Sequence, residues 1–127
     1  MRSEKGFSLI ETVVALAIVA IVAVSFLSGL ATSARATIVA DEQTTASSLA
    51  RSQMEDIKDQ TYDGTNNPPV YSLISSVPSS YTVDIDADRL DPEGDGFDDD
   101  DGIQKVVVTV ERGGRTILTL EDYKVDR

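Results

Sequence analysis

The sequence contains no cysteine, histidine or tryptophan, and it has only four prolines in 127 residues. Without cysteine the chain forms no disulfide and has no thiol nucleophile. Without cysteine and histidine it also lacks the usual zinc ligands and the commonest general base. Its serines carry no nucleophile motif, and its carboxylates crowd one loop. We therefore expect a protein that is not an enzyme.

Basic residues are scarce as well. Lysine and arginine together number 11 against 22 aspartates and glutamates, which gives a formal net charge of −11. A nucleic-acid-binding surface requires clustered basic side chains. No nucleic-acid partner is therefore expected. The length suggests one globular unit and an anchor.

The longest feature is a stretch without charge, residues 12–34, which covers 23 consecutive positions. A helix rises ~1.5 Å per residue and a bilayer core is ~30 Å thick, so about 20 apolar residues span it. The segment is predicted to insert into a membrane. A secretory signal peptide cut near Ala34 is the alternative. Glu11 within the apolar segment and the unbroken helical pattern beyond Ala34 favour a retained anchor.

The residues that precede the charge-free stretch are Gly6-Phe7-Ser8-Leu9-Ile10-Glu11. They resemble the class III signal of type IV prepilins and type II secretion pseudopilins, in which this motif is followed by a long apolar run. The resemblance implies that a prepilin peptidase cuts after Gly6 and methylates Phe7. It also implies that Glu11 acts in filament assembly. The rest of the chain is not fixed by this resemblance.

The leader, residues 1–6, carries Arg2 and Lys5 and is expected to stay in the cytoplasm. We therefore expect a single-pass inner-membrane protein with its N-terminus inside and its C-terminus outside, and later a periplasmic or extracellular filament subunit. A carboxylate in hydrocarbon requires a cation, and the freed amine of Phe7 in a neighbouring subunit would pair with Glu11. The alternative places Glu11 at the membrane surface, where it favours the helix dipole.

The predicted fold is α+β, a long hydrophobic N-terminal helix packed on a small antiparallel sheet. We expect residues 7–30 to form the membrane and assembly half of the helix, residues 31–62 its amphipathic half, and residues 63–127 a small β domain. A kink is expected near Ser28-Gly29, and the helix should end near Gln60, because Asp63-Gly64 stops it. The apolar face of the second half is predicted to contain Ala46, Leu49 or Ala50, Gln53 or Met54, and Ile57.

Strands are predicted at residues 81–86, 104–112 and 115–123, with a weak strand or an irregular connection at residues 70–77. Gly113-Gly114 is predicted to be a two-residue hairpin turn. The resulting register pairs Val107 with Leu120, Lys105 with Asp122, and Val110 with Ile117. Both faces carry apolar residues, so the pattern does not indicate which face meets the helix.

An acidic segment, residues 84–102, is predicted to be a loop, and it combines ten carboxylates with one cation. Part of it resembles an EF-hand-type calcium loop, because oxygen ligands alternate before a glycine. The expected calcium ligands are Asp91, Glu93, Asp95, the main-chain carbonyl of Phe97, and Asp99. Gly102 stands where such a loop has its bidentate glutamate, so a ligand from Asp100, Asp101 or another strand would have to replace it. The alternative is a solvated acidic loop.

Together these features predict a structural subunit, minor pilin or pseudopilin-like, of a type IV pilus or type II secretion filament. Its expected partners are other subunits, the prepilin peptidase, the inner-membrane assembly platform, and membrane lipid before assembly. The alternative is a membrane-anchored extracytoplasmic calcium-binding or sensor domain that does not polymerise. The sequence leaves open secretion, motility or adhesion, and DNA uptake.

Calcium is expected to raise the melting temperature of the soluble fragment that begins at Ala34, because the ion would neutralise the crowded carboxylates. Thermal denaturation in excess calcium and in EDTA measures the effect, with magnesium as the control. Identical melting curves in calcium and in EDTA would exclude a structural calcium ion.

Overall fold

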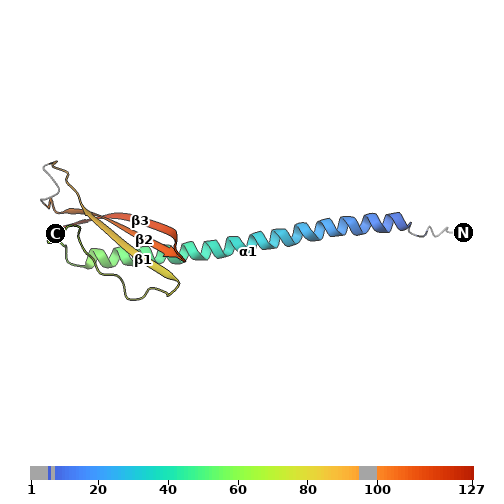
Figure 1. Ribbon diagram of the computed structural model, residues 1–127, viewed down its shortest axis with the longest axis horizontal. Coiled ribbons are helices and arrows are strands. Elements are labelled where there is room, and N and C mark those ends of the chain that lie inside the picture. Colours follow the sequence, from blue (N-terminus) through green and yellow to red (C-terminus); the bar gives the residue numbers. More distant parts are fainter. Residues whose placement is uncertain (1–5, 7, 95–99) are drawn as a thin grey trace. The chain divides into compact units, whose positions relative to one another are not determined.

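The computed structural model describes Gly6, residues 8–94 and residues 100–127. One helix precedes all the strands, so the fold class is α+β. Helix α1 (Leu9–Asp59) is followed by three strands, β1 (Tyr81–Arg89), β2 (Ile103–Arg112) and β3 (Arg115–Val125) (Figure 1). The chain divides into two units, which we name the helical unit (residues 1–40) and the sheet unit (residues 41–127). The predicted fold class is confirmed.

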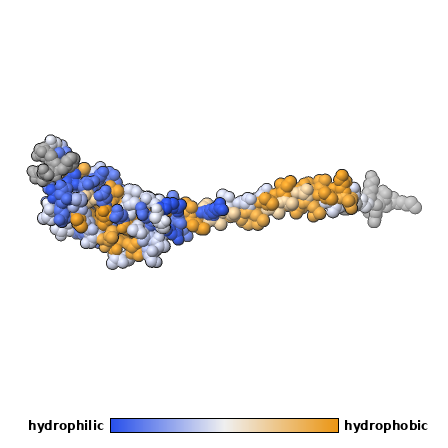
Figure 2. All heavy atoms as spheres, in the orientation of Figure 1, coloured by the Kyte–Doolittle hydropathy of each residue, from blue (hydrophilic) through white to orange (hydrophobic). Residues whose placement is uncertain are grey.

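The helical unit contains the first part of α1, which begins after Ser8. The main-chain oxygen of Ser8 accepts hydrogen bonds from the amides of Glu11 (3.0 Å) and Thr12 (3.2 Å). The helix continues without a break through Gly29. Its large apolar side chains from Leu9 to Leu30 are 52–85% exposed. Figure 2 shows this apolar surface in orange along the helical unit.

In the sheet unit, the second part of α1 packs on one face of the antiparallel sheet, whose strand order is β1-β2-β3. The predicted apolar face is confirmed, since every residue named for it is buried: Ala46, Leu49, Ala50, Gln53, Met54 and Ile57. The core lies entirely within the sheet unit, from Ala46 to Leu120. This unit therefore contains its whole apolar core.

Burial shows which sheet face meets the helix, a point that the sequence left open. Alternate residues of β2 are fully buried, namely Gln104, Val106, Val108 and Val110. Val83 and Ala87 of β1 are also buried. Each strand also extends beyond its predicted limits, because β1 ends at Arg89, β2 starts at Ile103 and β3 ends at Val125.

The predicted hairpin register is correct only beside the turn. Arg112 lies opposite Arg115 and Glu111 opposite Thr116, but a β-bulge follows between Val110 and Glu111. Beyond it Val110 lies opposite Leu118, so Ile117 is the additional residue of β3. An additional residue shifts the pairing by one position and changes which side chains share a face.

All three predicted side-chain pairs are therefore wrong. Val107 lies opposite Glu121 instead of Leu120, and Lys105 lies opposite Tyr123 instead of Asp122. Val110 lies opposite Leu118 instead of Ile117. The shift brings Leu118, Leu120 and Lys124 to the face that packs on α1, since they pair with buried positions of β2.

Side-chain amides hold the segment between α1 and β1, which is irregular. The Gln53 amide donates to the Ser72 carbonyl (3.0 Å) and accepts from the Ile74 amide (2.9 Å), as a neighbouring strand would. The Gln60 side chain likewise donates to the carbonyl of Ser72 (3.0 Å) and accepts from its amide (2.9 Å). These glutamines satisfy backbone groups that would otherwise require a strand partner. Residues 70–77 are thus an irregular connection.

Lys124 of β3 caps the C-terminal end of α1. Its side chain is 6% exposed, and its amine donates to the carbonyls of Ile57 (2.5 Å), Lys58 (3.1 Å) and Gln60 (2.7 Å). Burial lowers the pKa of Lys124, and the nearby carboxylate of Asp59 opposes that change. The last carbonyls of a helix lack partners within the helix, so a buried cation here replaces a local cap.

Lys124→Met, which keeps an unbranched apolar stem, is expected to reduce the free energy of unfolding by about 1–3 kcal/mol, because the helix-end carbonyls lose a charged donor. Urea denaturation of residues 34–127 measures the change. Lys105→Met, on the opposite sheet face, is the matched control and should alter stability by less than about 0.5 kcal/mol. Equal losses for both variants would contradict the capping role.

Candidate functional site

The predicted processing site lies directly before α1. Gly6 is exposed, and a Cβ atom added to it would meet no atom within 4 Å. Phe7 lies outside the described residues. The helix starts at Leu9, so Gly6 is outside regular secondary structure. Accessible backbone of this kind suits a peptidase substrate.

Glu11 lies in the first turn of α1 and is exposed. Ser8 and Glu11 have the spacing of a capping box, in which the first residue caps the helix and the fourth lies at N3. This spacing is visible in the sequence. It supports the alternative in which Glu11 acts at the start of its own helix, because a negative carboxylate in the first turn interacts favourably with the helix dipole. Within the part of the chain that the structure describes, no salt bridge pairs Glu11 with a cation.

Four hydroxyl groups of the helical unit form hydrogen bonds within the helix. The side chains of Thr12, Ser25, Thr32 and Thr37 each donate to the carbonyl four residues earlier, at 2.8–3.4 Å. Such bonds remove the need for an external polar partner. They suit surroundings without water, where every polar group has to be satisfied by the protein.

The helical unit presents a continuous apolar surface. Among the described residues, one helix, α1, is long enough and apolar enough to cross a membrane. Its large apolar side chains are more than half exposed from Leu9 to Leu30, far beyond what a monomer normally exposes to water. This surface requires a cover, either lipid or protein.

The structure separates the acidic segment into two parts. Asp84, Asp86 and Asp88 belong to β1 and are exposed. They alternate with the buried Val83 and Ala87, so they lie on the sheet face away from α1. These three aspartates are therefore strand residues and not part of a loop.

Of the predicted calcium ligands, Asp91 and Glu93 are described, and both follow β1. The Asp91 carboxylate accepts a hydrogen bond from the Gly94 amide (2.5 Å), and Gly94 has a positive φ of 77°. Asp95, Phe97 and Asp99 lie outside the described residues. The described carboxylates form no group of three or more that could hold a metal ion. Calcium binding thus remains a prediction.

Asp100, considered above as a replacement calcium ligand, is held at the end of the acidic segment. Its carboxylate accepts from the Tyr62 hydroxyl (2.5 Å) and the Gly102 amide (3.1 Å), and it lies 4.0 Å from the guanidinium of Arg89. Burial is the main reason that the pKa of Tyr62 is raised, and the hydrogen bond to Asp100 raises it further. A Cβ atom added to Gly64 would lie 3.1 Å from a carboxylate oxygen of Asp100, so that carboxylate would have to shift by a few tenths of an ångström.

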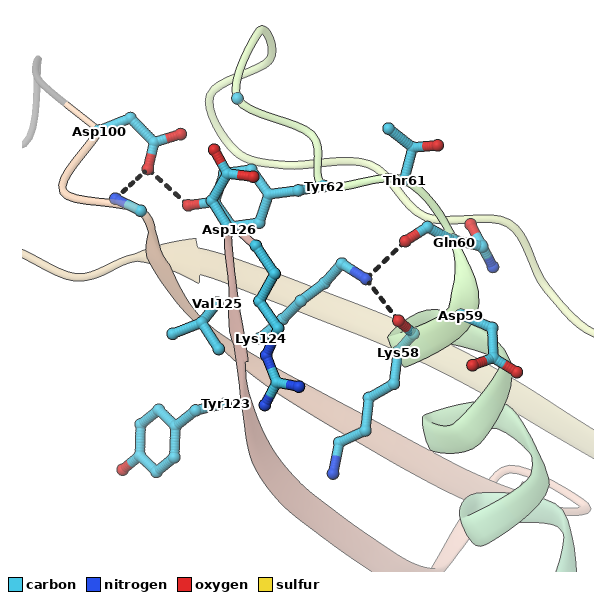
Figure 3. Close-up of a pocket in the computed structure, with 13 residues that line it drawn as sticks. Lys58, Asp59, Gln60, Thr61, Tyr62, Asp100, Tyr123, Lys124, Val125 and Asp126 are labelled. Atoms are coloured by element: carbon cyan, nitrogen blue, oxygen red, sulfur yellow. Dashed lines mark hydrogen bonds between the residues drawn. The ribbon is translucent and has the colours of Figure 1, made fainter.

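Figure 3 shows Asp100 and Tyr62 beside a polar hollow. The hollow is lined by the end of α1, by Asp100 and Gly102, and by the end of β3. Lys124 lies among these residues with its amine directed at the carbonyls of the helix end. Its described lining combines Lys58 and Lys124 with Asp59, Asp100 and Asp126. The hollow lies where the three segments meet.

Asp63 organises the turn that receives Arg89. Its carboxylate accepts from the amide and hydroxyl of Thr65, from the amide and side chain of Asn66, and from the Val70 amide, at 2.8–3.1 Å. These bonds lower the pKa of Asp63, and the bond from the Asn66 side chain contributes most. Arg89 then donates to the carbonyls of Gly64 (2.7 Å) and Asn66 (3.1 Å). Sequence reasoning identified Asp63 only as part of a helix stop.

Comparison with known proteins supports the N-terminal motif. Residues 1–27 match the family model of the prokaryotic N-terminal methylation motif. This motif is characteristic of type IV pilins and pseudopilins, so the resemblance inferred from residues 6–11 is confirmed. The comparisons found no similar curated protein and no similar solved structure.

The motif supports a pilin-like substrate of a prepilin peptidase, and proteins that carry it are structural subunits. It also implies assembly with other pilin subunits. Together with the apolar helix near the N-terminus, it fits membrane anchoring. The match covers the first 27 residues, so it describes the N-terminal segment and not the sheet unit.

The Asp63→Asn variant tests the turn beside the acidic segment. Because the folded pKa of Asp63 is lowered, its carboxylate stabilises the protein above the ordinary carboxyl pKa of about 4, and this contribution is lost as the pH falls towards the folded value. Wild type should exceed the variant in stability at pH 7, and the difference should shrink at pH 3. Urea denaturation of residues 34–127 measures it. Asp84→Asn, on the exposed face of β1, is the control, and a difference independent of pH would contradict the prediction.

Proposed function

We propose that this chain is a structural subunit, minor pilin or pseudopilin-like, of a type IV pilus or type II secretion filament, and that it is processed after Gly6. The observation that carries the proposal is the methylation motif at the start of a helix whose apolar side chains are exposed from Leu9 to Leu30. A peptidase that cuts after Gly6 would leave Phe7 as the new N-terminus. Glu11 would then be the first charged side chain of the mature chain.

Before assembly, the helical unit resides in the inner membrane, with its N-terminus in the cytoplasm and the sheet unit outside. The charge-free residues 12–34 are long enough for this span, and the hydroxyls of Thr12, Ser25 and Thr32, which bond within the helix, suit a lipid environment. Arg2 and Lys5 of the leader favour this orientation. In the filament, helices of other subunits replace lipid around the same surface.

Assembly then depends on the charge of Glu11. Its carboxylate enters apolar surroundings, where an unpaired charge is costly, and the new amine of Phe7 in a neighbouring subunit supplies a cation. Removing one partner of a buried charge pair costs about 3–5 kcal/mol, which is enough to reject subunits in a wrong register. A capping role within one chain is compatible with this, because a carboxylate can favour the dipole before it finds its partner.

Calcium binding by the acidic segment is a second part of the proposal. Arg89 and Asp100 fasten the chain on either side of the expected ligands, so an ion held by Asp91, Glu93, Asp95, Phe97 and Asp99 would bind a segment with fixed ends. Fixed ends reduce the ordering entropy that binding has to overcome. The ion would offset repulsion among ten carboxylates.

A sensor that does not polymerise is the second candidate. The observation that favours it is that the sheet unit contains its entire apolar core and most of the carboxylates, so it has the parts of a free-standing domain. Such a protein would use the helical unit only as an anchor. Its behaviour would not depend on Glu11.

Glu11→Gln is expected to reduce incorporation into filaments to a small fraction of wild type, because the amine of the neighbouring subunit loses its carboxylate. The variant should still insert in the membrane, since the apolar span is unchanged. Immunoblots of membrane and sheared-filament fractions from the native host measure both properties. Glu55→Gln, an exposed glutamate of the same helix in the sheet unit, is the matched control.

Mass spectrometry of the N-terminus in the same membrane fractions establishes processing. A start at methylated Phe7 supports the proposal, whereas an intact Met1 or a start near Arg35 contradicts it. Normal incorporation of Glu11→Gln would favour a different assembly mechanism, and the absence of wild-type protein from filaments would favour the sensor.

A further inference from the structure

Glu42 makes the first ionic contact between α1 and the sheet, one residue after the sheet unit begins. One carboxylate oxygen accepts from the guanidinium of Arg112 (2.9 Å), and the other accepts from that of Arg115 (2.8 Å). The Glu42 side chain is 13% exposed. Charge-assisted hydrogen bonds of this geometry are stronger than those between neutral groups.

The two arginines flank the turn of the β2–β3 hairpin, and Arg112 also reaches β1. Its guanidinium lies 5.4 Å from the ring centroid of Tyr81, the first residue of β1. Arginine at this distance from an aromatic ring makes a favourable cation–π contact. Glu42 therefore joins α1 to the same end of all three strands. We name Glu42, Arg112 and Arg115 the hairpin clamp.

The hairpin clamp lies outside the apolar core. The buried face of α1 begins at Ala46, one helical turn after Glu42, and Asp41 and Gln43 are exposed. Apolar packing therefore fixes the helix to the sheet only from Ala46 onwards. Without the clamp, the turn that starts at Asp41 would be free to separate from the hairpin while the core stayed intact.

We propose that the hairpin clamp fixes the point at which α1 enters the sheet unit, and that Glu42 is a positioning residue for filament assembly. This inference rests on the proposed function. Any force imposed on the preceding helix reaches the apolar core through residues 41–45, because these residues connect residues 1–40 to the packed part of α1 that begins at Ala46. A fixed entry turn removes a hinge from the start of the sheet unit, and such a hinge would add conformational entropy that ordered packing has to remove.

The test uses Glu42→Gln in the full-length chain, expressed in the native host and purified from membranes in detergent. Hydrogen exchange of the amides of residues 41–45 and of the hairpin turn should accelerate by about two- to fivefold, the factor expected for an ion pair whose arginines are partly exposed. Exchange of the core strand β2 around Val108 should stay unchanged. Incorporation into sheared filaments should fall, whereas cleavage before Phe7 and membrane insertion should match wild type.

Two further variants separate positioning from simple destabilisation. Lys124→Met weakens the other end of the same helix segment, so it is the stability control. If it lowers incorporation as much as Glu42→Gln does, positioning by Glu42 is overturned. The combined charge exchange, Glu42→Arg with Arg112→Glu and Arg115→Glu, restores opposite charges at this contact and should recover incorporation. Failure of this exchange in a protein with wild-type melting temperature also overturns the proposal.

The outcomes distinguish the clamp from the proposed function. Unchanged exchange of residues 41–45 in Glu42→Gln overturns the clamp, whatever the filament assay shows. Faster exchange with normal incorporation overturns its role in assembly. Normal incorporation of Glu11→Gln removes the assembly mechanism proposed for Glu11 and leaves the exchange result for Glu42 valid.

Discussion

The apolar surface of the helical unit is the constraint on which this protein depends. From Leu9 to Leu30 the helix exposes large apolar side chains to its surroundings, and the hydroxyls of Thr12 and Ser25 bond to carbonyls of the same helix. Such a surface is stable only when lipid or other apolar helices cover it. Glu11 is the charged exception at the start of this apolar surface. Its charge favours surroundings that provide a cation over surroundings that provide none.

The sheet unit is stabilised by a different principle, since its apolar core is small and the chain has no cysteine for a disulfide. Polar side chains complete what apolar packing leaves unsatisfied. Gln53 takes the place of a strand partner, Lys124 caps the helix end, and Glu42 holds the hairpin. Each bonds to groups far away in sequence, so together they fix how the helix, the connection and the strands meet.

The sequence predicted the elements well and the hairpin register poorly. The helix face that includes Ala46 and Ile57 followed from periodicity, and the Gly113-Gly114 turn followed from glycine conformational preferences. The additional residue Ile117 carries no local signal, because either register leaves apolar residues on both faces. Packing against α1 selected the bulged register, in which Lys124 reaches the helix end.

By itself the sequence determined the methylation motif, the membrane-length span and the α+β class, since each is written in contiguous residues with a fixed period or spacing. Only the tertiary structure decided which sheet face is buried and which distant groups Asp100, Glu42 and Lys124 bind. The reason is physical. Local periodicity fixes what a segment becomes, whereas the partner of a charged side chain depends on which segments the fold brings within hydrogen-bonding distance.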